Sequence, residues 1–244
     1  MLFTATAAPE TQADIAKTML LKNPVKIQMN PNRHNIFYKK VQRPRSELTQ
    51  DHLDTVLGEI SSSLKENPAS YPLTILYSNT KVISYSYSFM DKKLGEHQYA
   101  GEKTPENRIF AQYHQEYTEK MKAHVVQEIC KTNSRIRIVF ATVALGLGLD
   151  APHVRHVIHY IPPTSLERYF QETGRAGRDG DAAKATLYYN NSDIRRNRPG
   201  MQAEMASFCR IQQECLRKAM LTHFGCVVPD IQLEYPCCNI CQKD

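Results

Sequence analysis

The sequence lacks a hydrophobic run long enough to cross a bilayer. Its longest apolar stretch, Ile138–Leu149, is interrupted by Thr142, whereas a membrane-spanning helix needs about 20 apolar residues. The first residues end in small side chains like a signal-cleavage site, but they have neither a basic start nor an apolar core. The sequence therefore predicts neither a membrane protein nor an exported one.

Two short motifs of nucleotide-hydrolysing motors are also missing from the sequence. No segment reads Gly-x-x-x-x-Gly-Lys-[Ser/Thr], the loop that cradles phosphate groups. No Asp-Glu dipeptide is present to hold magnesium, and Gly101 precedes Lys103-Thr104 at the wrong spacing. The sequence thus excludes a complete motor ATPase site within these residues.

The composition fits a folded chain with a sizeable core. The 244 residues are 41% hydrophobic and 23% charged, which excludes a disordered or fibrous protein and leaves room for one large domain plus a smaller piece. Lys and Arg number 31 against 25 Asp and Glu, so the net charge is +6. This mild basic excess permits a polyanionic partner without establishing one.

The seven cysteines are unevenly placed. Cys130 stands alone and is predicted to be a core residue, whereas the other six follow residue 208: Cys209, Cys215, Cys226, Cys237, Cys238 and Cys241. An odd count, the absence of an export signal and the Cys238-x-x-Cys241 pair favour a metal site over disulfides.

Strand-like and helix-like segments alternate along the chain. Helices are predicted at Glu10–Leu21, Leu48–Leu64, Val82–Leu94, Phe110–Ile129 and from the cap Ser165 to Thr173, and strands at Val25–Met29, Leu73–Tyr77, Ile136–Phe140, Val154–Ile161 and Ala185–Tyr189. Pro31–Arg45 is interpreted as a connector that contains one strand-like run, Ile36–Tyr38. The alternation predicts an α/β fold with a parallel sheet and helices on both faces. Ligands of such sheets bind beyond the carboxyl ends of the strands.

Two glycine-rich segments carry the chemistry. Gln171–Gly180 places two Gly-Arg steps at a helix end, and Thr142–Pro152 follows a strand. Arginine matches phosphate oxygens with a planar fork, and glycine lets the backbone approach a ligand. A single Gly-Arg pair is compatible with a solvated turn, but two such steps within this alternation favour phosphate binding.

Together these segments resemble motifs V and VI of the second RecA-like domain of RecQ-family DNA helicases. The residues that match motif V are Thr142, Ala144, Gly146, Gly148, Asp150, Pro152, Val154, Arg155, Val157, Ile158 and His159. Leu145 and Leu147 depart from its usual aromatic residue and methionine. Motif VI matches throughout, and its initial Gln171 separates the chain from RNA helicases of the DEAD-box type.

The resemblance extends over the whole chain. Phe3–Ala7 is similar to motif III, Ile75–Lys81 to motif IV, Tyr113-His114 to a pair that follows motif IV, and Cys209–Gly225 to the start of a zinc subdomain. Arg33 and Asn35-Ile36 resemble the family's linker. The resemblance implies residues 1–30 as the end of a first RecA-like domain, 31–45 as a linker, 46–192 as the second RecA-like domain and 193–244 as a small, incomplete helical zinc-binding subdomain.

The resemblance also implies a role for each site residue. The catalytic residues would be Arg175, Arg178 and Gln171, with Arg178 nearer the γ-phosphate of ATP. Asp150 and Gly148 would join the two arginines in binding nucleotide, Asp150 either by contact or by positioning the arginines. The residues implied to bind DNA are Thr142, Tyr77, Ser78, Asn79, His114 and Arg155.

The resemblance further implies Cys215 as a helix-borne zinc ligand beside the Cys238 and Cys241 pair. Cys226, which lies between the helix and the Cys238 and Cys241 pair, is taken as the fourth ligand. Cys237 and a residue after Asp244 are the alternatives; Cys237 is adjacent to Cys238, and two adjacent ligands strain the geometry of a metal site. Cys209 is predicted to pack in the core. ATP and Mg²⁺ would be shared with the first RecA-like domain.

The function implied is that of part of an ATP-dependent 3′–5′ DNA helicase in repair and recombination, located in the nucleus or the nucleoid. Its partners would be single-stranded, forked or junction DNA and the first RecA-like domain, with no membrane. The chain is expected to be a piece of a longer helicase and inactive alone. The alternatives are a non-catalytic nucleic-acid-binding module and a protein–protein adaptor.

Overall fold

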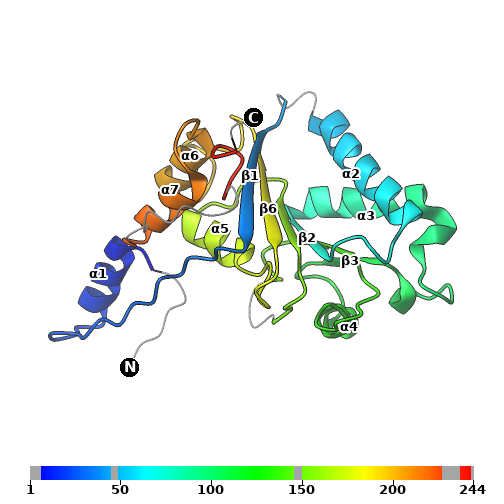
Figure 1. Ribbon diagram of the computed structural model, residues 1–244, viewed down its shortest axis with the longest axis horizontal. Coiled ribbons are helices and arrows are strands. Elements are labelled where there is room, and N and C mark those ends of the chain that lie inside the picture. The colour runs from blue at the N-terminus through cyan, green and yellow to red at the C-terminus, as the bar shows by residue number, and fades with distance from the viewer. Residues whose placement is uncertain (1–6, 45–48, 146–149, 227–236, 243–244) are drawn as a thin grey trace.

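Six strands of the described residues pair in one parallel sheet, in the order β1-β6-β5-β2-β4-β3. Figure 1 labels β1, β6, β2 and β3 of this sheet. The computed structural model describes residues 7–44, 49–145, 150–226 and 237–242. The strands are β1 (Ile36–Gln42), β2 (Thr74–Tyr77), β3 (Phe110–Tyr113), β4 (Ile138–Ala141), β5 (His156–His159) and β6 (Ala183–Tyr189). The helices are α1 (Pro9–Thr18), α2 (Thr49–Glu66), α3 (Thr80–Leu94), α4 (Glu119–Ile129), α5 (Leu166–Thr173), α6 (Ala203–Arg210) and α7 (Leu216–His223), with short 3-10 turns η2 (Gly95–Gln98) and η3 (Pro105–Asn107).

Helices cover both faces of the sheet and make a core on each. Successive residues of a strand point to opposite faces, so Ile75 joins one core and Leu76 the other, and both are fully buried. Helices α2 and α3 cover the face of Leu76, whereas α4, α5, α6 and α7 pack against the face of Ile75. The predicted parallel sheet with helices on both faces is confirmed.

The segment 110–129, expected as one helix, is instead a strand followed by a helix. β3 lies at the edge of the sheet beside β4. Phe110 and Ala111 are buried on its opposite faces. Helix α4 begins only after Thr118, whose side chain accepts a hydrogen bond from the Met121 N–H at 3.4 Å. The apolar residues 110 and 111 fit both periodicities, and pairing with β4 selects the extended one.

Two further segments differ from expectation. Val25–Met29, expected as a strand, is not one, and Val25, Ile27 and Met29 are 88%, 92% and 86% exposed. An extended segment gains its hydrogen bonds only from a neighbouring strand, and none pairs with it among the described residues. Residues 36–42 of the expected connector form β1 and pair with β6 along their whole length.

The C-terminal cysteine segment lies along β1. The Tyr38 N–H donates to the Cys237 carbonyl at 3.1 Å, and the Asn239 N–H donates to the Tyr38 carbonyl at 3.0 Å. Lys40 Nζ also donates to the carbonyls of Phe208 and Ile211, at the end of α6. These contacts join the cysteine segment and α6 to an edge strand that would otherwise expose its backbone groups.

Candidate functional site

The carboxyl ends of β2, β4 and β3 bring four predicted DNA-binding residues to one edge of the sheet. Ser78 and Asn79 follow β2, Thr142 follows β4 and His114 follows β3. The Ser78 N–H donates to the Ala141 carbonyl at 3.0 Å, and the Thr142 N–H donates to the Tyr113 carbonyl at 3.0 Å. Because these strands are neighbours, the residues that follow them form one surface at this edge.

The side chains at this edge offer donors and acceptors suited to a phosphate chain. Asn79 caps α3 by accepting from the Val82 N–H at 2.9 Å, so the positive end of that helix faces the same edge. Thr142 Oγ1 accepts from the Ala144 N–H at 3.3 Å. Ser78 Oγ and His114 Nδ1 are buried and have no hydrogen-bond partner within the described part of the chain. The side chain of Asn79 is exposed and that of Thr142 is half-buried, so these two are accessible to a ligand at this edge.

Tyr77, also predicted to bind DNA, lies beneath this edge. Its side chain is buried, its hydroxyl donates to the Leu145 carbonyl at 2.9 Å, and its ring stacks on His159 at 5.2 Å between centroids. Burial raises the pKa of this hydroxyl, while the Arg175 guanidinium that hydrogen-bonds it acts in the opposite direction. Tyr77 is therefore an internal bridge between the strand end and the motif VI segment.

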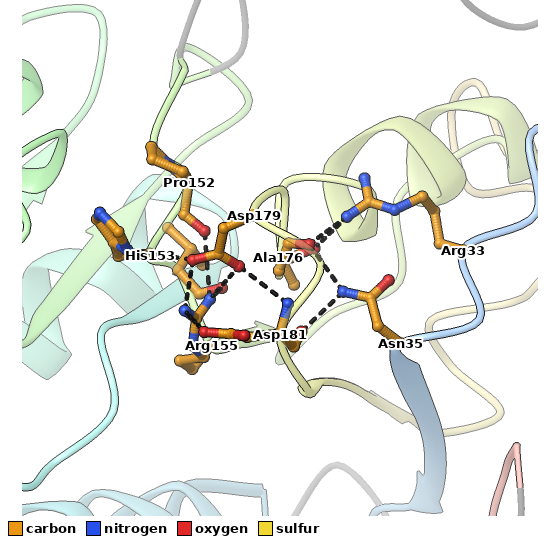
Figure 2. Close-up of polar contacts among 10 residues, drawn as sticks. Arg33, Asn35, Pro152, His153, Arg155, Ala176, Asp179 and Asp181 are labelled. Carbon is orange, nitrogen blue, oxygen red and sulfur yellow. Dashed lines mark hydrogen bonds and ion pairs between the residues drawn. The ribbon is translucent and has the colours of Figure 1, made fainter. Parts of the chain in front are cut away.

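Arg155 lies at the opposite end of the sheet from the other predicted DNA contacts. It precedes the first residue of β5, and its guanidinium contacts Asp179 at 3.0 Å and Asp181 at 2.9 Å (Figure 2). His153 Nδ1 contacts Asp179 at 3.1 Å. The hydrogen bonds from Arg155 lower the pKa of Asp179 to about 2. Arg155 thus holds the loop after α5. It does not join the surface formed by Ser78, Asn79, His114 and Thr142 at the carboxyl ends of the strands, which we call the carboxyl-edge surface.

The loop after α5 carries the two arginines. Helix α5 begins at its predicted cap Ser165, whose hydroxyl accepts from the Arg168 N–H at 3.2 Å. Arg175 is buried, with 8% of its surface exposed. The Arg178 side chain is 35% exposed and pairs with Asp150 at 3.1 Å. The two arginines therefore differ in access, Arg175 toward the interior and Arg178 toward the surface.

Gln171 and Gly148 are the two remaining residues of the predicted nucleotide site. Gln171 is exposed on α5, and Gly148 lies outside the described residues, as do residues 1–6, which include most of the motif III segment. Gly177 has a φ of 59°, and a Cβ there would lie 2.4 Å from Asn35 Nδ2 and 2.6 Å from the Asp181 carbonyl. Only glycine fits this turn.

Several residues near the site carried no predicted role. Glu172 and His159 form a buried pair at 2.7 Å beneath the loop. Asp179 and Asp181 receive Arg155, as described above. Of these residues, Asp179 could have been found from the sequence, because it directly follows Arg178. The burial of Glu172 has no signature in a single sequence.

Four cysteines form a separate cluster: Cys215, Cys237, Cys238 and Cys241. Their sulfur atoms all lie within 4.8 Å of one another, with 3.2 Å between Cys215 and Cys237 and 3.5 Å between Cys238 and Cys241. Four thiolates around tetrahedral zinc, with bonds of about 2.3 Å, lie about 3.8 Å apart. The cluster fits such an ion with little movement.

The electrostatics of the cluster also suit a cation. Hydrogen bonds from the thiols of Cys215 and Cys237 lower the pKa of Cys238. Burial and the neighbouring sulfur atoms raise the pKa of Cys241 to about 12. Four crowded thiols cannot all ionise unless a cation compensates their charge.

The fourth member of this cluster is Cys237, the alternative fourth ligand, whereas Cys226, the preferred one, lies outside the cluster. The Cys226 sulfur instead contacts Gln28 Nε2 at 3.5 Å and lies outside the cluster. Cys237 and Cys238 both reach the cluster because the segment runs beside β1 and then turns, with the Cys241 N–H donating to the Cys238 carbonyl at 3.1 Å. Cys209 is buried in the core, as predicted.

Comparisons with known proteins give one consistent result. Residues 54–180 match the family described as the helicase conserved C-terminal domain. The chain is 31% identical to mouse ATP-dependent DNA helicase Q1, covering 99% of this chain and 36% of the relative. It is 30% identical to ATP-dependent helicase SGS1 of Saccharomyces cerevisiae and 27% identical to RecQ-like DNA helicase BLM of Xenopus laevis, covering 15% and 16% of those proteins. The chain thus spans about a third or less of these relatives' length.

Solved structures support the fold. S. cerevisiae Dbp5 bound to RNA and ADP BeF3 has a TM-score of 0.60 at 15% identity and covers 93% of this chain and 49% of Dbp5. Mycobacterium smegmatis helicase Lhr bound to single-stranded DNA and AMP-PNP has a TM-score of 0.58 at 20% identity, covering 78% of this chain and 24% of Lhr. Among the residues described, no helix combines the length and apolar character that a bilayer requires.

Proposed function

Because the chain belongs to the helicase conserved C-terminal domain family, among its RecQ-type members, we propose that it is the second motor domain of an ATP-dependent 3′–5′ DNA helicase. In this proposal a first RecA-like domain supplies the phosphate loop and the magnesium-binding acids, which this sequence lacks. ATP and Mg²⁺ are shared between the two domains, and residues 1–30 belong to the first of them.

The placement of the two motif VI arginines is the observation that carries the proposal. Arg178, half-buried on the outside of its loop, serves as the arginine finger toward the γ-phosphate, where its charge stabilises the transition state. Asp150 orients Arg178 from 3.1 Å. Arg175, buried against Tyr77, links this loop to the rest of the domain, and Gln171 senses the nucleotide.

The carboxyl-edge surface is proposed to hold the phosphodiester chain of single-stranded, forked or junction DNA. Ser78, Asn79, Thr142 and His114 supply polar contacts, and the N-terminus of α3 favours a negative charge. Tyr77 directly precedes Ser78, and the Arg175 guanidinium is near enough to its hydroxyl to lower the pKa of that group against the effect of burial, so one buried residue separates the two proposed sites. In this proposal, a movement of Arg175 on ATP hydrolysis would therefore be transmitted through Tyr77 to Ser78 at the DNA-binding surface.

The cysteine cluster is proposed to hold a structural zinc ion with Cys215, Cys237, Cys238 and Cys241 as ligands. The ion would fix the N-terminus of α7 beside β1 within a helical subdomain from residue 193 onward. The proposed cellular role is that of RecQ-type helicases, namely DNA repair and recombination. The proposed location is the nucleus, or the nucleoid of a prokaryote.

A chimera tests the proposal. This chain replaces the matching third of mouse ATP-dependent DNA helicase Q1, so that the mouse protein supplies the phosphate loop. The purified chain alone should show no appreciable ATP hydrolysis, whereas the chimera should hydrolyse ATP when single-stranded DNA is added. Arg178→Ala should lower kcat by about a thousandfold or more with little change in KM for ATP.

The matched control is Arg196→Ala, which removes an exposed arginine from another loop and should leave kcat unchanged. Hydrolysis by the chain alone that Arg178→Ala abolishes would contradict the shared site. A chimera that binds single-stranded DNA but does not hydrolyse ATP would favour the non-catalytic binding module.

A further inference from the structure

The segment that precedes β1 holds the loop that carries Arg178. Arg33 Nη1 donates to the Gly174 carbonyl at 3.2 Å. Its Nη2 donates to the carbonyls of Ala176, at 3.2 Å, and Gly177, and Figure 2 shows this side of the guanidinium pointing at the loop. One guanidinium therefore binds three backbone carbonyls that follow the last turn of α5. These three carbonyls belong to residues beyond the end of α5, and the planar fork of arginine can bind several carbonyls at once.

Asn35 holds the same loop from the neighbouring position. Its Nδ2 donates to the Gly177 carbonyl and to the Asp181 carbonyl, both at 2.7 Å. The amide occupies the space that a Cβ of residue 177 would fill. The Asn35 carbonyl in turn accepts from the Ala183 N–H at 2.9 Å, where β6 begins. The loop is thus tied to residue 35 at three points.

The residues on both sides of Arg178 are therefore fixed by other side chains. Gly177, before it, is held by Arg33 and Asn35, and Asp179, after it, is held by Arg155 (Figure 2). The Arg178 side chain itself remains 35% exposed. This arrangement fixes where the side chain starts while leaving its guanidinium accessible.

Arg33 is itself anchored by the helix that carries a cysteine of the cluster. Arg217 of α7 is buried and donates to Asn32 Oδ1 at 2.9 Å, to the Arg33 carbonyl and to the Ile36 carbonyl at 2.6 Å. Helix α7 begins next to Cys215. A continuous set of polar contacts thus runs from the cysteine cluster through residues 32–36 to the Arg178 loop.

We propose that Arg33 and Asn35 are positioning residues for Arg178, set on the segment that joins the two motor domains. The inference rests on the proposed function, since it assigns Arg178 its role at the γ-phosphate. A change in the path of residues 32–36 would displace Gly174–Gly177 and so move the arginine finger.

The first test measures the backbone hydrogen exchange of the loop and needs no enzymatic activity. Arg33→Lys keeps the positive charge, but a single ammonium cannot span three carbonyls, so hydrogen–deuterium exchange of peptides covering residues 174–182 should accelerate by about tenfold or more. Arg198→Lys is the matched control, because Arg198 also donates to two backbone carbonyls, those of Asp193 and Pro162, away from this loop. The proposal would be overturned if exchange of residues 174–182 accelerated equally in Arg198→Lys, or if it did not accelerate in Arg33→Lys.

The second test uses the chimera. Arg33→Lys and Asn35→Ala should each lower kcat by about tenfold to a hundredfold, as expected for a misplaced catalytic group, while KM for ATP stays within about twofold. Added to Arg178→Ala, neither should lower kcat further, because the group that they position is already gone. Losses that simply add would show a structural role and overturn the proposal.

The two tests separate this inference from the proposed function. If hydrolysis by the chimera does not depend on Arg178, the proposed function fails. The exchange measurement still decides whether Arg33 fixes the loop.

Discussion

At the scale of single residues, Asp179, directly after Arg178, has a carboxylate held by several hydrogen-bond donors. Asp179 accepts hydrogen bonds from Arg155 and His153 and from the Asp181 N–H, at 3.2 Å. These donors stabilise the carboxylate over the protonated acid and so lower its pKa from 3.8 to about 2. The loop geometry is thus linked to the ionisation of one side chain.

This linkage predicts a loss of stability in acid. The folded-state pKa of Asp179 is below its unfolded value, so its contribution is complete above about pH 4 and is lost as the pH falls to about 2. Urea unfolding of the wild type and of Asp179→Asn should therefore give a difference in unfolding free energy that is largest near neutral pH and shrinks below about pH 4. A difference that stays constant across this range would contradict the assignment.

Residue identities at the site were only partly predictable. Motif spacing pointed to Arg175 and Arg178, and the structure shows how differently the two are exposed. Tyr77 and Arg155 match the motifs equally well, yet one is buried and the other lies at the far end of the sheet. A sequence gives the distance along the chain, whereas access to a ligand depends on which end of the strand a residue occupies.

At the scale of elements, α7 depends on the cysteine cluster at its start. Cys215 caps the helix by accepting from the Lys218 N–H at 3.5 Å. Arg217, two residues later, binds the segment before β1. Removing a metal from the cluster would therefore release the first turn of α7 and its contacts with β1.

We expect one zinc ion per purified chain by elemental analysis. Cys237→Ser should weaken zinc binding by more than about 100-fold, because loss of an outer-shell contact alone costs up to that much. Cys226→Ser is the matched control and should keep both the metal content and the affinity. Retention of tight binding in Cys237→Ser, together with its loss in Cys226→Ser, would restore the ligand set expected from the sequence.

Most elements followed from periodicity and end signals. The helix at residues 80–94 and the strands around residues 75 and 139 stand close to where the apolar patterns put them. The exceptions share a physical cause, since β1, β3 and the segment 25–29 were each decided by whether a neighbouring strand pairs with them. Such pairing is a long-range contact, and a local window of sequence does not contain it.

At the scale of the whole molecule, one sheet serves two cores, so the two sides cannot unfold independently. Ile75 and Leu76 are neighbours in the central strand β2 and belong to different cores, and both are fully buried. A cavity on either side weakens the same strand. Cooperativity across the sheet follows from this sharing.

Ile75→Ala and Leu76→Ala should each cost about 2 to 5 kcal/mol of unfolding free energy. Each should shift one common transition, whether it is followed by far-ultraviolet circular dichroism or by tyrosine fluorescence. Ile27→Ala, at a position 92% exposed, is the control and should stay within about 0.5 kcal/mol of the wild type. Two separate transitions in either core variant would contradict the shared sheet.

The pairing of β1 with β6 has a consequence for synthesis on the ribosome. β1 leaves the exit tunnel first, yet its neighbour in the sheet is the last strand, with Ile36 opposite Ala183. In the folded protein Ile36 and Tyr38 are 1% and 2% exposed. Until β6 emerges, these side chains remain exposed to water or bound by a chaperone. A chain whose synthesis ends between these strands would have a first strand with no β6 to pair with, and such a chain would be prone to aggregate.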